Sequence, residues 1–170
     1  MGEIPKDMTR ELVERVLQQG EIRLSAQLQI ALAADQRAVT AAAILVAVAS
    51  VTLGFAGDEI TKAATDIPFA VSTALAGLML LISAAVCVTA AMPTKFALAG
   101  AVPENWWSDG VTERAYEECL WRESCNYTRR IVDNRETLRQ NADRLRLGMY
   151  LACSAPVTGL ASFGVVRLCL

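Results

Sequence analysis

The chain has 170 residues, 54% of them hydrophobic, and its mean hydropathy of +0.34 lies above the usual globular range. Its formal net charge of −2 excludes the strongly basic surface that attracts nucleic acid. It contains no histidine, and its five cysteines form no CxxC pair. A Cys/His zinc site, a Ser-His-Asp triad and a Cys-His dyad are therefore excluded within one chain, and we expect no metal and no cofactor.

The N-terminal segment has the pattern of an amphipathic helix. From Met8 onward, apolar residues recur at spacings of three, four and seven, while Gln, Glu and Arg occupy the other faces. This spacing predicts a helix from about Thr9 to about Phe55, with a bend at Gly20, that enters the first apolar run without a breaker. We assign residues 1–37 to this helix outside the membrane.

Three runs contain no charged residue: 20 residues at 38–57, 28 at 67–94 and 20 at 147–166. About 20 apolar residues in a helix cross a hydrocarbon core of about 30 Å. The sequence therefore predicts an all-α integral membrane protein with three transmembrane helices. The first two, at 38–57 and 67–92, form a hairpin within residues 38–94, and residues 147–170 hold the third.

Local features refine these spans. Asp66 and Pro68 predict a capped start for the second helix, and Pro156 predicts a kink in the third. Small side chains also predict one smooth strip on the first span, against which another helix can pack. This strip consists of Ala38, Ala42, Ala43, Ala47, Ser50 and Gly54.

Residues 95–146 read as a Trp-containing loop followed by a coiled-coil-like helix from about Val111. Apolar residues and two asparagines repeat every seven residues, as in a coiled-coil seam. Asparagine in such a seam lowers stability but fixes the register of the paired helices. The predicted oligomer seam consists of Tyr127, Ile131, Asn134, Leu138, Asn141 and Leu145. Its partner is the N-terminal helix of the same chain, the same helix of a neighbouring chain, or both.

Basic and aromatic residues near the span ends predict contacts with the membrane interface. These anchors are Arg37, Lys95, Trp106, Trp107, Arg144 and Arg146. The distribution of Lys and Arg predicts that the N-terminus and residues 95–146 are cytoplasmic, so that two spans extend into long cytoplasmic helical arms. The C-terminus then lies on the periplasmic side.

No ionisable residue lies inside a predicted span, which argues against a transporter, a proton path and an intramembrane enzyme. We therefore expect a non-enzymatic protein. Its expected partners are the lipid bilayer and either further copies of itself or the other subunits of a membrane complex. Nucleic acid is not expected.

Two stretches mark the entries into the first and last spans: Asp35-Gln36-Arg37-Ala38 and Arg144-Leu145-Arg146-Leu147. With these stretches, the layout resembles the small bacterial three-span membrane proteins of the Pycsar-type effector family, the transmembrane partners of cyclic-nucleotide signalling in phage defence. The resemblance implies a location in the bacterial inner membrane, no catalytic residues, and an oligomer that disturbs the membrane when triggered.

Two functional hypotheses follow. The first is a small inner-membrane protein that self-associates or joins a larger membrane complex through its cytoplasmic helices. The second is a membrane-disrupting effector of a bacterial cyclic-nucleotide defence system. The first predicts harmless expression, and the second predicts loss of membrane potential.

Overall fold

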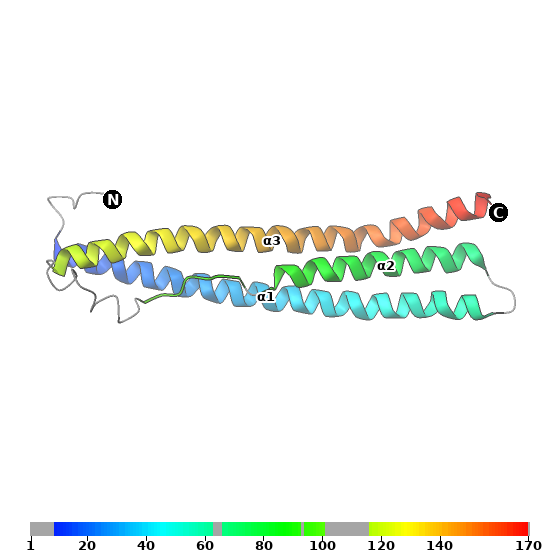
Figure 1. Cartoon of the computed structure of the whole chain (residues 1–170), viewed down its shortest axis with the longest axis horizontal. Coiled ribbons are helices and arrows are strands. Elements are labelled where there is room, and N and C mark those ends of the chain that lie inside the picture. The colour runs from blue at the N-terminus through cyan, green and yellow to red at the C-terminus, as the bar shows by residue number, and fades with distance from the viewer. Residues whose placement is uncertain (1–8, 63–65, 93, 101–115, 170) are drawn as a thin grey trace. The chain divides into compact units, whose positions relative to one another are not determined.

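The computed structural model describes residues 9–62, 66–92, 94–100 and 116–169, and three helices make up most of them (Figure 1). These are α1 (Arg10–Thr61), α2 (Ile67–Ala90) and α3 (Tyr116–Cys169). No strand occurs in the described ranges. Each helix contains a segment long and apolar enough to cross a membrane. The prediction of an all-α chain with three candidate membrane spans is confirmed.

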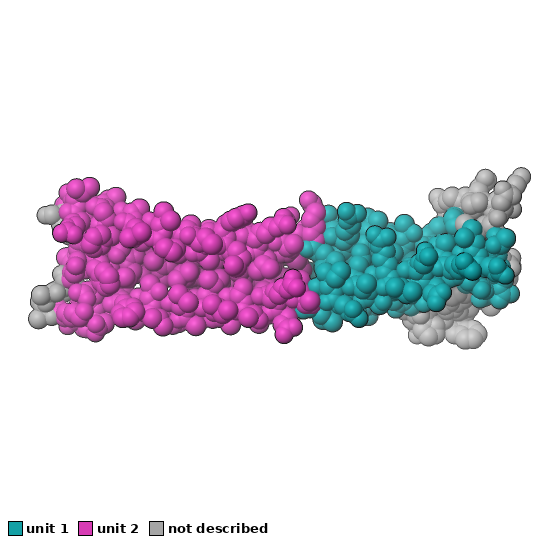
Figure 2. Space-filling view, turned by 180° about the vertical axis from the view of Figure 1, so that it is seen from behind, with its two compact units in different colours: residues 1–32, 94–138 teal, residues 33–93, 139–170 magenta. Residues whose placement is uncertain are grey.

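The chain divides into two compact units, coloured separately in Figure 2. Unit 1 comprises residues 1–32 and 94–138, and unit 2 comprises residues 33–93 and 139–170. Both α1 and α3 contribute residues to each unit. Unit 2 holds the three uncharged runs, and unit 1 holds most of the charged residues.

The helix boundaries follow local chemistry. As predicted, α1 runs without interruption, and it ends six residues beyond Phe55. The predicted start of α2 is confirmed, because the Asp66 carboxylate accepts a hydrogen bond of 3.3 Å from the Phe69 amide. Helix α3 continues through Pro156 to Cys169, and Figure 1 shows it curving over its last turns.

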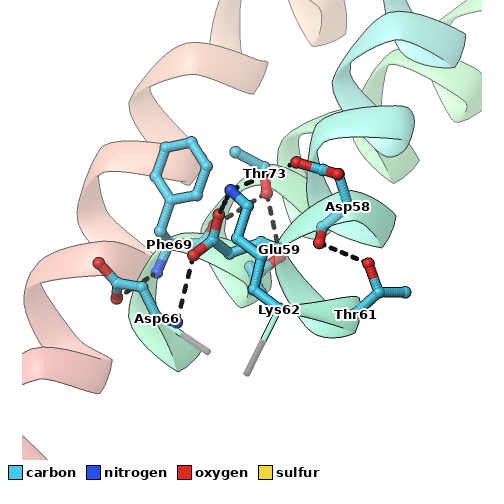
Figure 3. Close-up of polar contacts among 8 residues, drawn as sticks. Asp58, Glu59, Thr61, Lys62, Asp66, Phe69 and Thr73 are labelled. Atoms are coloured by element: carbon cyan, nitrogen blue, oxygen red, sulfur yellow. Dashed lines mark hydrogen bonds and ion pairs between the residues drawn. The ribbon is translucent and has the colours of Figure 1, made fainter. Parts of the chain in front are cut away.

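Polar contacts gather where α1 ends and α2 begins (Figure 3). The Lys62 ammonium pairs with Glu59 and lies 3.3 Å from Asp58 Oδ2. The Asp66 amide donates to Glu59 Oε1 at 3.4 Å. The hydrogen bond from Lys62 lowers the pKa of Glu59 below its usual value. These contacts give the charged groups next to the apolar runs ion-pair and hydrogen-bond partners.

In unit 2, α2 and α3 lie close together at Gly148. A Cβ atom added to Gly148 would lie only 2.5 Å from the Cys87 sulfur. Next to this contact, the buried Ser83 hydroxyl donates to the Gly148 carbonyl at 2.6 Å. Such backbone approach and interhelical hydrogen bonding hold helices together in an apolar medium.

Two further glycines bring α2 close to its neighbours in unit 2. A Cβ on Gly77 would lie 2.7 Å from Leu53 Cγ of α1. A Cβ on Gly159 would lie 3.3 Å from Ala76 Cβ of α2. At these positions of unit 2 a glycine faces the neighbouring helix, and its lack of a side chain lets the two helices come close together.

The inward positions of α3 recur every seven residues, as expected for helices packed with a left-handed supercoil. Five of these seven positions are buried, and Asn141 and Ser162 are half-buried. The positions are Leu120, Tyr127, Asn134, Asn141, Gly148, Ala155 and Ser162.

Replacing Gly148 with alanine tests the close approach of α2 and α3. Because the added methyl overlaps the Cys87 sulfur, we expect a loss of about 1–3 kcal/mol in the free energy of unfolding. Circular dichroism in detergent during denaturant titration measures this loss. Gly164→Ala is the matched control, because no other helix of the described part of the chain comes within 4 Å of its Cβ position. Equal stability of the two variants would contradict the packing described.

Candidate interaction surface on helix α1

Helix α1 packs into unit 2 through one face, here called the inner face. Its side chains alternate at spacings of three and four residues, and all are buried or half-buried. The inner face consists of Ala38, Ala42, Leu45, Ala49, Thr52 and Ala56. Apart from Leu45, its members are Ala or Thr, and such small side chains permit close approach of helix backbones.

A second face with the same spacing, the outer face, is exposed throughout. It consists of Gln36, Thr40, Ala43, Ala47, Ser50, Gly54 and Gly57. Each of the first six residues stands two positions before a member of the inner face, and two positions turn about 200° around a helix. The outer face therefore lies opposite the inner face.

A shallow, open groove of about 560 Å³ borders the beginning of the outer face. It is lined by Ala33, Gln36, Arg37, Thr40, Ala41 and Ile44, of which Gln36 and Thr40 belong to the outer face. Farther along α1, no atom of another helix among the described residues lies within 4 Å of the Cβ positions of Gly54 and Gly57. Larger exposed side chains border this line at heptad spacing, with Ile44 and Val51 on one side and Val39 and Val46 on the other.

The hydroxyl groups of the outer face are bonded within α1. Thr40 Oγ1 donates to the Gln36 carbonyl, and Ser50 Oγ donates to the Val46 carbonyl, each at 2.8 Å. No three His, Cys, Asp or Glu side chains of the described residues lie close enough together to hold a metal ion. The outer face therefore has no hydroxyl hydrogen free to bind a polar ligand, and its small side chains leave room for an apolar neighbour.

The structure corrects the single strip of small residues predicted on the first span. Ala38 and Ala42 belong to the inner face, whereas Ala43, Ala47 and Ser50, together with Gly54, belong to the outer face. Their small size alone does not distinguish the two sets. Heptad spacing separates the two sets.

The predicted seam residues of α3 are placed as follows. Tyr127 and Asn134 are buried, and Ile131, Leu138, Asn141 and Leu145 are half-buried. Asn134 is only 1% exposed and contacts its own chain: its Nδ2 donates to the Ala97 carbonyl at 2.8 Å, and its Oδ1 accepts from the Ala97 amide at 2.9 Å. Asn134 therefore holds segment 94–100 against α3.

Tyr127 joins α1, α3 and segment 94–100 in unit 1. Its hydroxyl donates to Glu21 Oε1 at 3.1 Å and accepts from the Gly100 amide at 3.2 Å. Burial raises the pKa of Tyr127, and the hydrogen bond to Glu21 adds to this shift. A Cβ on Gly20 would lie 2.8 Å from Tyr127 Cδ2. Gly20 makes room for this ring, and the predicted bend of α1 at Gly20 stays a prediction.

Of the partners left open for the seam, the N-terminal helix of the same chain is therefore present in unit 1. Besides the Tyr127 contact, Gln27 Nε2 donates to the Ile131 carbonyl at 3.1 Å. A seam between neighbouring chains stays a prediction.

The predicted anchors Arg37 and Lys95 are exposed. Trp106 and Trp107 lie outside the described residues. Contact of these anchors with lipid stays a prediction.

Two further anchors, on α3, have contacts within the chain. Arg144 Nη1 donates to the Thr89 carbonyl at 3.4 Å, where a cation complements the C-terminal end of α2. Arg146 Nη1 lies 3.6 Å from Asp143 Oδ1.

Comparisons of this chain with protein-family models, curated proteins and solved structures found no match. The case for a function therefore depends on the geometry of the helices.

The Asn134 contact predicts a local loss of order in the variant Asn134→Ala. The change leaves the Ala97 amide and carbonyl without their partner, at a cost of about 1–3 kcal/mol per buried group. Hydrogen exchange of segment 94–100 should become faster, while exchange in unit 2 stays the same. Asn126→Ala is the control, because Asn126 is exposed and bonds only to Glu123 among the described residues. Unchanged exchange at Ala97 would refute this role of Asn134.

Proposed function

We propose that this protein is a non-enzymatic membrane protein that self-associates through the outer face of α1. The observation that carries the proposal is the pairing of two opposite heptad faces on one helix, of which one packs inside unit 2 and the other is exposed. Both faces are made mostly of small residues. The second chain would pack on the outer face as α2 and α3 pack on their neighbours.

The lipid bilayer determines which kind of helix face favours self-association. Lipid tails are as apolar as a leucine side chain, so burial of apolar area gives helices in a bilayer little reason to associate. Close packing of backbones at small residues supplies the attraction instead. The outer face meets this requirement at Ala43, Ala47 and Ser50, and at Gly54 and Gly57.

Apolar side chains exposed in unit 1 support further contacts with a larger assembly. Ile22, Ile30 and Leu32 of α1 and Val132 of α3 are each between 59% and 61% exposed. Unit 1 carries most of the charged residues, so these side chains are expected to face water, where exposed apolar groups favour contact with protein. We propose that the cytoplasmic helical arms also make contacts within such an assembly.

We propose a location in the bacterial inner membrane, with the N-terminus cytoplasmic and the C-terminus periplasmic. Lys and Arg near the span ends support this orientation, since cytoplasmic segments carry the excess of these residues. Arg37, Lys95 and Arg144 would share the cytoplasmic side, and Lys62 and Arg167 the other.

Enlarging the outer face tests self-association. Ala47→Leu and Gly54→Leu should each weaken association by about 1–3 kcal/mol, because the added side chains keep the second helix away. Light scattering in detergent or subunit counting in vesicles measures the assembly. Val48→Leu is the control, since Val48 is exposed but lies outside the outer face. A wild-type protein that stays a monomer of 18.3 kDa, or variants that assemble normally, would refute the proposal.

The membrane-disrupting effector is the second candidate, and it rests on the resemblance of the two span entries to the Pycsar-type family. A self-associating outer face serves this function as well, so the assembly state does not separate the two. A membrane-potential dye does. We expect cells that express the protein to keep their potential, and depolarisation that disappears in Gly54→Leu would favour the effector.

A further inference from the structure

A second hollow lies in unit 2, where all three helices meet. It has a volume of about 360 Å³, and its lining comes from Thr52 of α1, from Phe69, Ser72, Thr73 and Ala76 of α2, and from Pro156, Gly159, Leu160 and Phe163 of α3. Two of its lining residues, Ser72 and Gly159, are buried. Phe69 and Leu160 are exposed at 40% and 75%, so they form its rim.

The hollow is apolar in its chemistry. Its three hydroxyl groups donate within their own helices: Thr52 to the Val48 carbonyl, and Ser72 and Thr73 to the Phe69 carbonyl, at 2.8–2.9 Å. No hydroxyl hydrogen is left to bind a polar ligand. A hydrocarbon chain fits such a lining, and the volume lies in the range of ligand pockets in proteins.

Two of the lining residues each contact a charged group. The guanidinium carbon of Arg167 lies 5.9 Å from the centre of the Phe163 ring. The Asp66 carboxylate accepts from the Phe69 amide, and Figure 3 shows these two residues adjacent at the start of α2. The lining residues all belong to the three uncharged runs, and a cation and a carboxylate each contact one of them.

We infer that this hollow binds one phospholipid with an ammonium-bearing, zwitterionic headgroup. One acyl chain fills the space between Thr52, Pro156 and Phe163. The phosphate pairs with Arg167, whose planar guanidinium matches phosphate oxygens. The ammonium group of the lipid pairs with Asp66. A purely anionic lipid would leave Asp66 beside a like charge, and a free phosphate would leave the apolar hollow unfilled.

Native mass spectrometry of the purified protein, mixed with equal amounts of phosphatidylethanolamine and phosphatidylglycerol, tests this inference. The wild-type chain should retain one phosphatidylethanolamine in preference to phosphatidylglycerol. Thr52→Phe should abolish retention by filling the hollow, while Val51→Phe, at an exposed neighbouring position, should not. Arg167→Gln should weaken retention about fivefold. Asp66→Asn, which keeps a good helix cap, should remove the preference for the ammonium headgroup.

Three results would overturn the inference. One is equal retention of lipid by Thr52→Phe and Val51→Phe while circular dichroism shows both to be folded. The second is a preference for phosphatidylglycerol, and the third is binding of an apolar molecule that is not a phospholipid. The same spectra also report the assembly state. Because Thr52 belongs to the inner face of α1, Thr52→Phe should abolish lipid retention without changing self-association, so failure of this inference can be told from failure of the proposed function.

Discussion

Unit 2 depends on close approach between helix backbones. Close contacts occur at Gly77 and Gly148, where a single added carbon would overlap a neighbouring residue, and at Gly159, where it would lie 3.3 Å from Ala76 Cβ. Segments that are apolar on every side cannot choose a partner by burying apolar area, so shape decides which faces meet. The small residues of α1, α2 and α3 are therefore the part of the sequence that specifies the packing of unit 2.

The inward positions of α3 show how the same spacing serves two kinds of packing. In unit 1 these positions hold Leu120, Tyr127 and Asn134, large side chains that bury area and complete hydrogen bonds with segment 94–100 and α1. In unit 2 they hold Asn141, Gly148, Ala155 and Ser162, of which the two buried ones are Gly148 and Ala155. Burial of large groups stabilises contacts in water, whereas small groups permit close contact where water is absent. The change in residue size along α3 thus matches the change from charged to uncharged surroundings.

Much of this architecture follows from the sequence. Uncharged runs of sufficient length predict the three helices, and the Asp66–Pro68 pattern predicts the start of α2. The sequence reveals the spacing of the small residues of α1 but not which of its two opposite faces packs inside the chain, because both are equally small. Asn134 was predicted at a seam for a similar reason: the heptad pattern identifies an inward position without naming its partner. That partner is segment 94–100, which has no periodic pattern of its own.

The central claim is that α1 has one face for its own chain and an opposite face for a second copy. Disulfide cross-linking in native membranes tests it most directly, with single cysteines placed along α1 in a protein whose native cysteines are replaced by alanine. Cross-linked dimers should peak at Gln36, Thr40, Ala43, Ala47, Ser50, Gly54 and Gly57. Cysteines at Ala38, Ala42, Leu45, Ala49 and Ala56 should give none. A yield without this heptad alternation, or one that peaks on the inner face, would contradict the account.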